Sequence, residues 1–214
     1  MPVCEMNETR PAVFIIDDDE SVRLGLSELL RSVGLDARAF ASAEEFLDSN
    51  HPDVPSCIVL DVRLRGPSGL EFQQTLSKQN VQLPIIFISG HSDIPISVRA
   101  MKSGAIEFLT KPLKEQELLD AVHAGIARDR TRHQEAKLVA GLRARFDSLT
   151  PREREIMALV VAGNGTKQIA GQSGLSEATV KVHRSHIMHK MMAKSVVDLV
   201  RIADRLGVPK KKAT

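Results

Sequence analysis

The sequence predicts an α/β domain built on a five-stranded, doubly wound parallel sheet, followed by a smaller all-α domain of four helices that contains a helix-turn-helix. Three observations lead to this prediction. Short apolar runs alternate with helical patterns up to about residue 126, the remainder has helical periodicity with clear cap residues, and the two parts carry opposite net charge. A length of 214 residues suits two compact domains better than one.

Five short apolar runs in the first part have the composition of buried β-strands. A helical pattern follows each of them, and this order produces a parallel sheet with helices on both faces. The expected strands are residues 13–16, 37–40, 57–60, 84–88 and 105–109. The expected helices lie around residues 22–30, 43–47, 70–76 and 96–101, and a further one begins near Lys114. Ser42 is the expected N-cap of the second helix, with Glu45 three residues later.

Chemistry-bearing residues follow the strands at the positions where a parallel sheet forms its site. These residues are Asp17, Asp18, Asp61, Ser89 and Lys111. Carboxylates this close together repel one another unless a cation lies among them. Two cations could compensate their charge, namely the ammonium of Lys111 and a hard divalent cation such as Mg²⁺. Each residue alone also fits a turn, a helix cap or a solvated loop. Because all of them fall at one edge of one sheet, a functional site is the better interpretation.

The peptide bond between Lys111 and Pro112 is a further feature of this edge. X-Pro bonds can be cis in tight turns, and a cis bond here would aim the ammonium of Lys111 inward. The sequence leaves the isomer open.

A charged segment, residues 127–146, connects the two parts. It has a helix-favouring composition, no proline, and a narrow apolar stripe formed by Leu138, Leu142 and Phe146. An ordinary helical linker is the preferred interpretation. The alternatives are an extension of the preceding helix and a surface that packs against a neighbour.

The second part opens with a strong helix start. Thr150 is the expected N-cap, Pro151 the first helical residue and Glu153 the capping-box partner, and the helix stops at Gly163. A short helix from Thr166 and a turn at residues 173–176, with Ser176 as the next cap, then lead into a basic amphipathic helix. That helix should direct Val180, Ile187 and Met191 inward, and a fourth helix should span residues 196–206. Two helices joined by a glycine turn, the second of them basic, indicate a helix-turn-helix.

Composition narrows the class of protein. Residues 1–126 carry 11 Lys or Arg against 19 Asp or Glu, whereas residues 127–214 carry 18 against 8, so the second part is a candidate for nucleic-acid binding. No apolar run is long enough to cross a bilayer. The two cysteines, Cys4 and Cys57, form no metal-ligand spacing. We therefore expect a cytoplasmic protein in a reducing setting, without a disulfide framework or a membrane partner.

The first part, residues 11–126, resembles the flavodoxin-like receiver domain of two-component response regulators. The resemblance rests on the segments IIDDDESV, IVLDVRLRGPSG, IIFISGHSD and AIEFLTKP. It implies that Asp61 accepts a phosphoryl group from a sensor histidine kinase. It also implies that Mg²⁺ is held by Asp17, Asp18, Asp61 and the backbone carbonyl of Arg63. Ser89 and Lys111 would contact the phosphoryl group and Phe108 would turn inward behind Ser89, although Phe108 also fits an ordinary core position.

The second part, residues 147–207, resembles the LuxR-type DNA-binding domain. The matching segments are LTPREREIMALVVAG, KQIAGQSGLSEATVKVHRSHIMHKM and KSVVDLV. Both parts together resemble a response regulator of the NarL/FixJ family, and SGHSDIP favours the FixJ-like branch. Residues 208–214 form a basic tail. The positions that the resemblance assigns to DNA contact are Lys167, Thr179, Lys181, Val182, Arg184, Ser185 and Lys190.

Two residues of the second part depart from the family pattern, and three histidines raise the possibility of a metal site. Ser185 occupies a position that is often basic in this family, which puts one DNA contact in doubt. Asn164 stands where an apolar residue is common, which puts the local packing in doubt. A metal site at His183, His186 and His189 is disfavoured, because a three-residue spacing drifts around a helix.

The resemblance implies a regulator and not an enzyme. Phosphorylation would promote a homodimer through the fourth helix, fifth strand and fifth helix, binding to promoter DNA, contact with RNA polymerase and activation of transcription. Apolar candidates for that dimer face are Ile96, Val98, Met101 and Ile106.

Two other hypotheses remain open at this point. The first is a phosphatase of the haloacid-dehalogenase type, which also uses a strand-end Asp and magnesium. Ser21 and the lack of a later acidic pair argue against it. The second is a DNA-binding protein whose receiver works without phosphorylation.

Overall fold

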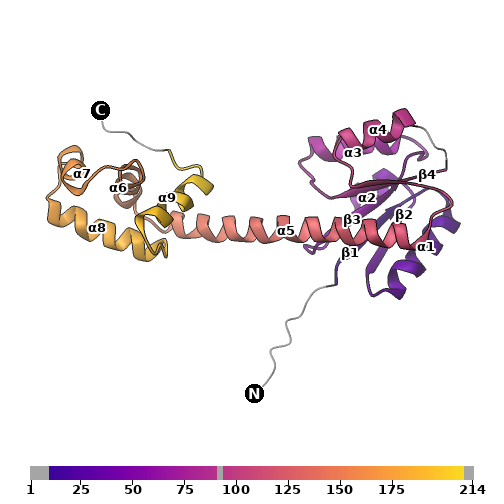
Figure 1. Cartoon of the computed structure of the whole chain (residues 1–214), viewed down its shortest axis with the longest axis horizontal. Helices are drawn as coiled ribbons and strands as arrows, with labels where there is room; N and C mark the ends of the chain where they lie inside the picture. The colour runs from indigo at the N-terminus through magenta and orange to yellow at the C-terminus, as the bar shows by residue number, and fades with distance from the viewer. Residues whose placement is uncertain (1–9, 91–93, 210–214) are drawn as a thin grey trace, which may run out of the picture. The chain divides into compact units, whose positions relative to one another are not determined.

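The computed structural model describes residues 10–90 and 94–209, and the chain divides into two compact units between His133 and Gln134. The first unit is an α/β sandwich and the second is entirely helical (Figure 1). The strands are β1 (Ala12–Ile16), β2 (Asp36–Phe40), β3 (Ser56–Asp61), β4 (Ile85–Ser89) and β5 (Glu107–Thr110). The helices of the first unit are α1 (Glu20–Ser32), α2 (Ala43–Asp48), α3 (Gly69–Lys78), α4 (Ile94–Lys102) and the start of α5 (Glu115–Asp147).

All neighbouring strands pair in parallel, in the order β2-β1-β3-β4-β5. The doubly wound sheet expected from the sequence is therefore confirmed. The order places β1 beside β3, in a register that pairs Ile16 with Leu60. As a result, the residues that leave β1 and the last residue of β3 lie side by side at one edge of the sheet.

The sheet is covered on both faces, which is why its central strands are apolar on both sides. On one face, Phe14, Phe46 and Phe72 join residues from α2, α3 and α4 in one buried cluster. On the other face, Val13 and Ile15 pack against residues of α1 and α5. Alternate residues of β1 thus serve opposite cores, as the two-residue period of a strand requires.

Two elements differ from the sequence-based expectation. The fifth strand begins at Glu107 rather than Ala105, because the chain turns at Gly104 (φ +92°) and only then joins the ladder. Segment 127–146 forms no separate element, since α5 continues without a break to Asp147. Of the alternatives considered for this segment, extension of the preceding helix describes the structure.

A buried carboxylate fixes the part of α5 that lies beyond residue 126 to the first unit. Asp129 is fully buried and accepts hydrogen bonds from Ser56 N (2.8 Å) and Arg132 Nε (2.7 Å). His133 lies 3.2 Å from the same carboxylate and 3.1 Å from Asp53. These contacts explain why the first compact unit extends to His133.

The second unit consists of the end of α5 with α6 (Pro151–Val161), α7 (Thr166–Ser173), α8 (Glu177–Lys190) and α9 (Val196–Arg205). Its core contains the inward-facing residues expected for the basic helix, namely Val180, Ile187 and Met191. Thr150 and Glu153 form the expected capping box at the start of α6, and Ser176 caps α8. The apolar stripe on α5 is only partly buried, because Leu142 packs into the core of the second unit whereas Leu138 remains exposed.

Parts of the expected organisation fall outside the described residues. These are Cys4, most of the basic tail (residues 210–214) and the HSD portion of SGHSDIP (residues 91–93). Within the described ranges, no helix has both the length and the apolar character needed to span a bilayer.

The packing around Gly69 generates a prediction. A Cβ at this position would lie 2.3 Å from the carbonyl oxygen of Asp61, whereas a Cβ on Gly25 would have no neighbour within 4 Å. We expect Gly69→Ala to destabilise the protein by about 2 kcal/mol or more, because backbone must move to relieve the overlap. Chemical denaturation measures this. Gly25→Ala, in the middle of α1, is the matched control and should be neutral or slightly stabilising. Equal stability of both variants would contradict the assignment of a tight contact at Gly69.

Candidate functional site

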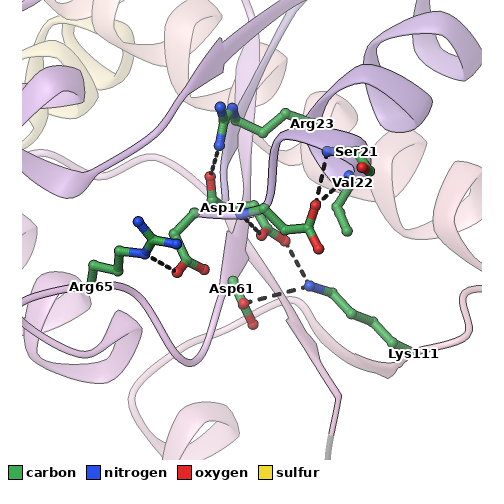
Figure 2. A network of polar contacts seen from close by, with 9 residues as sticks. Asp17, Ser21, Val22, Arg23, Asp61, Arg65 and Lys111 are labelled. Carbon is green, nitrogen blue, oxygen red and sulfur yellow. Dashed lines mark hydrogen bonds and ion pairs between the residues drawn. The ribbon is translucent and has the colours of Figure 1, made fainter.

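The carboxyl edge of the sheet brings together the acidic residues expected from the sequence. Asp17 and Asp18 follow β1, and Asp61 is the last residue of β3. One carboxylate oxygen from each of them lies within 4.8 Å of the others. Figure 2 shows Asp17 and Asp61 both directed toward Lys111. Asp17 and Asp61 are buried, while Asp18 is partly exposed. A compact set of carboxylate oxygens open to water on one side suits a hard divalent cation such as Mg²⁺.

Lys111 is the cation that β5 delivers to this cluster. Its Nζ lies 2.7 Å from Asp17 Oδ2 and 3.5 Å from Asp61 Oδ2. The Lys111–Pro112 peptide bond is cis, which resolves the isomer that the sequence left open. The backbone N–H of Lys111 donates to the carbonyl oxygen of Ser89 (2.7 Å), so the ends of β4 and β5 are joined directly at the site.

The electrostatics of Asp61 reflect opposing influences. Burial raises the pKa of its carboxyl group, the charge of Lys111 lowers it, and the neighbouring Asp17 raises it again, with a net upward shift. A backbone hydrogen bond from Arg63 favours the ionised form. For Lys111, burial alone would lower the pKa, but the hydrogen bond to Asp17 and the charges of Asp17 and Asp61 together raise it. The lysine is therefore held fully charged at neutral pH.

The loop after β1 is fixed by its own hydrogen bonds. The N–H of Asp19 donates to Asp17 Oδ1 (2.9 Å), and the Asp19 carboxylate caps α1 by accepting from the N–H groups of Ser21 and Val22. Arg23 donates from Nη1 to the carbonyl oxygen of Asp17 (2.8 Å). Asp17 is thus oriented from several sides (Figure 2).

Arg65 provides a contact that the sequence analysis did not predict. It lies on the loop after β3, and its Nε donates to Asp18 Oδ2 at 3.1 Å. The signal was present, because a cation four residues after Asp61 lies on the loop that borders the acidic cluster. The direction of a long exposed side chain, however, cannot be read from a pattern.

The two expected switch residues lie on β4 and β5. Ser89 ends β4, is buried, and pairs in register with Thr110 of β5. Phe108 is partly buried, and its ring lies 6.4 Å from that of Phe87, centroid to centroid. Both residues are positioned near the edge that carries Lys111. Their roles remain predictions, as does the carbonyl of Arg63 as a cation ligand.

The helix-turn-helix consists of α7 and α8, with Gly174 in the left-handed conformation (φ +63°) between them. This glycine is needed because a side chain is disfavoured at that backbone angle. Of the residues assigned to DNA contact on α7 and α8, most have exposed side chains and Arg184 is partly buried. The exposed ones are Lys167, Thr179, Lys181, Val182 and Ser185. The exposed face of α8 is therefore available for a partner.

Lys190 differs from the other assigned DNA contacts. Its Nζ donates to Glu153 Oε2 at 2.7 Å, and the Glu153 side chain is only 4% exposed. A phosphate contact would have to share or break this ion pair. The hydrogen bond from Lys190 is the largest influence that lowers the pKa of Glu153 to about 2, and hydrogen bonds from Thr150 add to it.

The structure also accounts for a residue that the sequence left in question. Asn164 is buried, and its Nδ2 donates to the carbonyl oxygen of Leu159 (2.9 Å), so the polar side chain helps to close the end of α6. Among the described residues, the acidic cluster of the first unit is the one group of His, Cys, Asp or Glu side chains arranged to hold a metal ion.

Two family models match the chain and together cover most of it. Residues 13–123 match the response regulator receiver domain, and residues 147–203 match the bacterial regulatory proteins of the luxR family.

Curated relatives match along nearly the whole chain. Nodulation protein W of Bradyrhizobium diazoefficiens is 52% identical over 94% of this chain and 88% of its own length. Response regulator protein TodT of Pseudomonas putida is 43% identical over 94% of this chain and 88% of its own length. Transcriptional regulatory protein FixJ of Azorhizobium caulinodans is 41% identical over 95% of this chain and 96% of its own.

Solved structures give the same result. Response regulator StyR has a TM-score of 0.82 and 46% identity over 92% of this chain and all of that chain. Full-length FixJ from B. japonicum has a TM-score of 0.55 and 35% identity over 93% of this chain and 98% of its own.

The ion pair between Lys190 and Glu153 generates a pH prediction. Because the folded pKa of Glu153 (about 2) lies below its ordinary value of 4.5, its stabilising contribution is present above about pH 4.5 and is lost as the pH falls towards 2. Glu153→Gln should lower stability at neutral pH by about 2 kcal/mol, less than for a fully buried pair because Lys190 stays partly exposed. The stability of the variant should also lack the decrease that this ion pair causes in the wild type as the pH falls from about 4.5 towards 2.

Urea unfolding, followed through the methyl signals of Met157 and Met191 in the core of the second unit, measures this effect. The control is Glu155→Gln on the same helix, which breaks a half-exposed pair with Arg152 and should change stability by less than about 1 kcal/mol. A Glu153→Gln variant with wild-type stability and an unchanged acid profile would refute the prediction.

Proposed function

The chain belongs to the two-component response regulators that combine a receiver domain with a LuxR-type DNA-binding domain, and from this premise we propose that phosphorylation of Asp61 controls its binding to promoter DNA. The family consists of transcriptional regulators and not of enzymes, which sets the phosphatase hypothesis aside. The observation that carries the proposal is the position of Asp61, within 4.8 Å of two further carboxylates and beside Lys111.

In the proposed reaction, a carboxylate oxygen of Asp61 attacks the phosphorus of a phosphohistidine on a sensor histidine kinase. The bond from phosphorus to the histidine nitrogen breaks, the imidazole leaves, and Asp61 carries an acyl phosphate. Catalysis of such a transfer depends mainly on positioning and on stabilising charge over the phosphoryl oxygens. The ammonium of Lys111, 3.5 Å from Asp61, is placed to do this.

The proposed cation site uses Asp17, Asp18, Asp61 and the carbonyl oxygen of Arg63. Mg²⁺ bound there would supply positive charge next to the transferred group. Asp17 is fixed by the hydrogen bonds from Asp19 and Lys111, so the ligand set is ordered by this chain's own contacts. The hydroxyl of Ser89 is the proposed further contact to the phosphoryl group.

The proposed output face consists of α4, β5 and α5. Val98 and Met101 of α4 are exposed apolar side chains, as a dimer surface requires, whereas Ile96 and Ile106 are partly buried against the core clusters. Inward movement of Phe108 would accompany phosphorylation and favour dimerisation through this face.

The proposed outcome is activation of transcription. A dimer would present two copies of α8 to paired half-sites in promoter DNA, and RNA polymerase would be recruited there. Phosphate contacts, such as that proposed for Lys167, would position the protein. The few residues that reach base edges would specify the sequence. The proposed place of action is the cytoplasm, where the bacterial chromosome lies.

The Asp61 assignment is tested by DNA binding with and without a small acyl-phosphate donor and Mg²⁺. The donor should raise the affinity of the wild type by about tenfold, within the usual range of allosteric coupling, and should leave Asp61→Asn unchanged. Asp48→Asn, at the exposed end of α2, is the matched control and should respond like the wild type. If Asp61→Asn responds as well, the receiver acts independently of this residue and the proposal is wrong.

The assignment of Lys167 is tested by the salt dependence of DNA binding. Lys167→Ala should weaken binding to specific and unrelated DNA alike and reduce the slope of log K against log salt by about one, because one phosphate contact is lost. Lys137→Ala, on the exposed face of α5, removes the same charge outside the helix-turn-helix and should leave the slope unchanged. An unchanged slope for Lys167→Ala would remove this residue from the interface.

A further inference from the structure

Arg65 places a second cation at the acidic cluster. Its Nε lies 3.1 Å from Asp18 Oδ2, and its side chain is 87% exposed, against 27% for Asp18. Figure 2 shows Arg65 on the opposite side of Asp61 from Lys111. Arg63, two residues earlier on the same loop, has an exposed side chain that forms no ion pair within the described parts of the chain. The contact is therefore specific to one of two neighbouring arginines.

With Arg65, each of the three carboxylates has a cationic partner from the chain itself. Lys111 contacts Asp17 and Asp61, and Arg65 contacts Asp18. These are the carboxylates whose oxygens are arranged to hold a metal ion. A divalent cation that draws on Asp18 must consequently share that carboxylate with Arg65 or displace the guanidinium.

The two cations are held differently. Lys111 is 23% exposed and lies within reach of two buried carboxylates, so its contacts are strongly constrained. Arg65 makes one contact from a largely solvated side chain, and such pairs are weak and screened by salt. Arg65 is thus the partner that an incoming cation would displace first.

We propose that Arg65 competes with Mg²⁺ for Asp18 and so sets the Mg²⁺ concentration at which the receiver can be phosphorylated. The inference rests on the proposed cation site. Arg65 is a positioning residue, since it acts through Asp18 and not on the phosphoryl group.

The size of the effect follows from the exposure of the pair. Loss of an exposed ion pair, together with removal of a positive charge next to a divalent cation, should strengthen Mg²⁺ binding by roughly three- to tenfold at low ionic strength. The gain should shrink at high ionic strength, where exposed charges are screened.

Calorimetric titration of the full-length protein with MgCl₂ tests the proposal, using wild type, Arg65→Ala and Lys78→Ala. The Kd for Mg²⁺ should fall by three- to tenfold in Arg65→Ala and by less than twofold in Lys78→Ala, which removes one positive charge from the exposed last turn of α3, outside the proposed cation site. Arg65→Met retains the aliphatic stem and should behave as Arg65→Ala. Thermal unfolding gives a second readout, because Mg²⁺ at one fixed concentration should raise the Tm of Arg65→Ala more than that of the wild type.

The outcomes separate this inference from the function on which it rests. If the wild type binds no Mg²⁺, the proposed cation site itself is wrong. If the wild type binds Mg²⁺ but the Kd of Arg65→Ala is unchanged or higher, competition by Arg65 is refuted while the cation site stands. Equal gains in Arg65→Ala and Lys78→Ala would show a general effect of net charge and would overturn the specific contact with Asp18.

Discussion

Mutual repulsion among three carboxylates at one edge of the sheet is the constraint on which the rest of the structure depends. Two unit charges at the observed spacing of up to 4.8 Å repel by about 3 kcal/mol at an effective dielectric constant near 20. Asp17 and Asp61 are also withdrawn from water, which raises the cost. Lys111 beside Asp17 and Asp61, Arg65 beside Asp18, and the hydrogen bonds within the loop after β1 offset this repulsion.

The same constraint connects the site to the proposed output. A phosphoryl group on Asp61 would add about −1.5 to −2 charges to the edge of the sheet, where the negative charge of the three carboxylates already requires nearby cations. Lys111, which would respond most directly, follows β5, and its backbone is hydrogen-bonded to the end of β4. β5 carries Phe108 and is flanked by α4, where Val98 and Met101 are exposed. Phosphorylation can affect the α4 surface by this route only if β5 and α4 have two alternative conformations and the added charge favours one of them.

Much of this architecture could be predicted because it depends on local rules. Apolar runs identified the strands, cap residues such as Thr150 and Ser176 marked the helix starts, and the geometry of a parallel sheet brought Asp17, Asp18 and Asp61 together. Features set by long-range contacts were missed. The hydrogen bond from Ser56 to Asp129 of α5 and the Arg65–Asp18 and Lys190–Glu153 pairs all join residues far apart in the chain.

We propose that the clustered carboxylates make Asp61 a cation-dependent phosphoacceptor. The most direct test is to locate the phosphoryl group by mass spectrometry of peptides after reaction with a phosphorylated sensor-kinase domain, with Mg²⁺ or with a chelator. We expect a single phosphoryl group on the peptide that contains Asp61, formed with Mg²⁺ and strongly reduced by the chelator. Transfer to another residue, or equal transfer to Asp61 when the cation is removed, would contradict it.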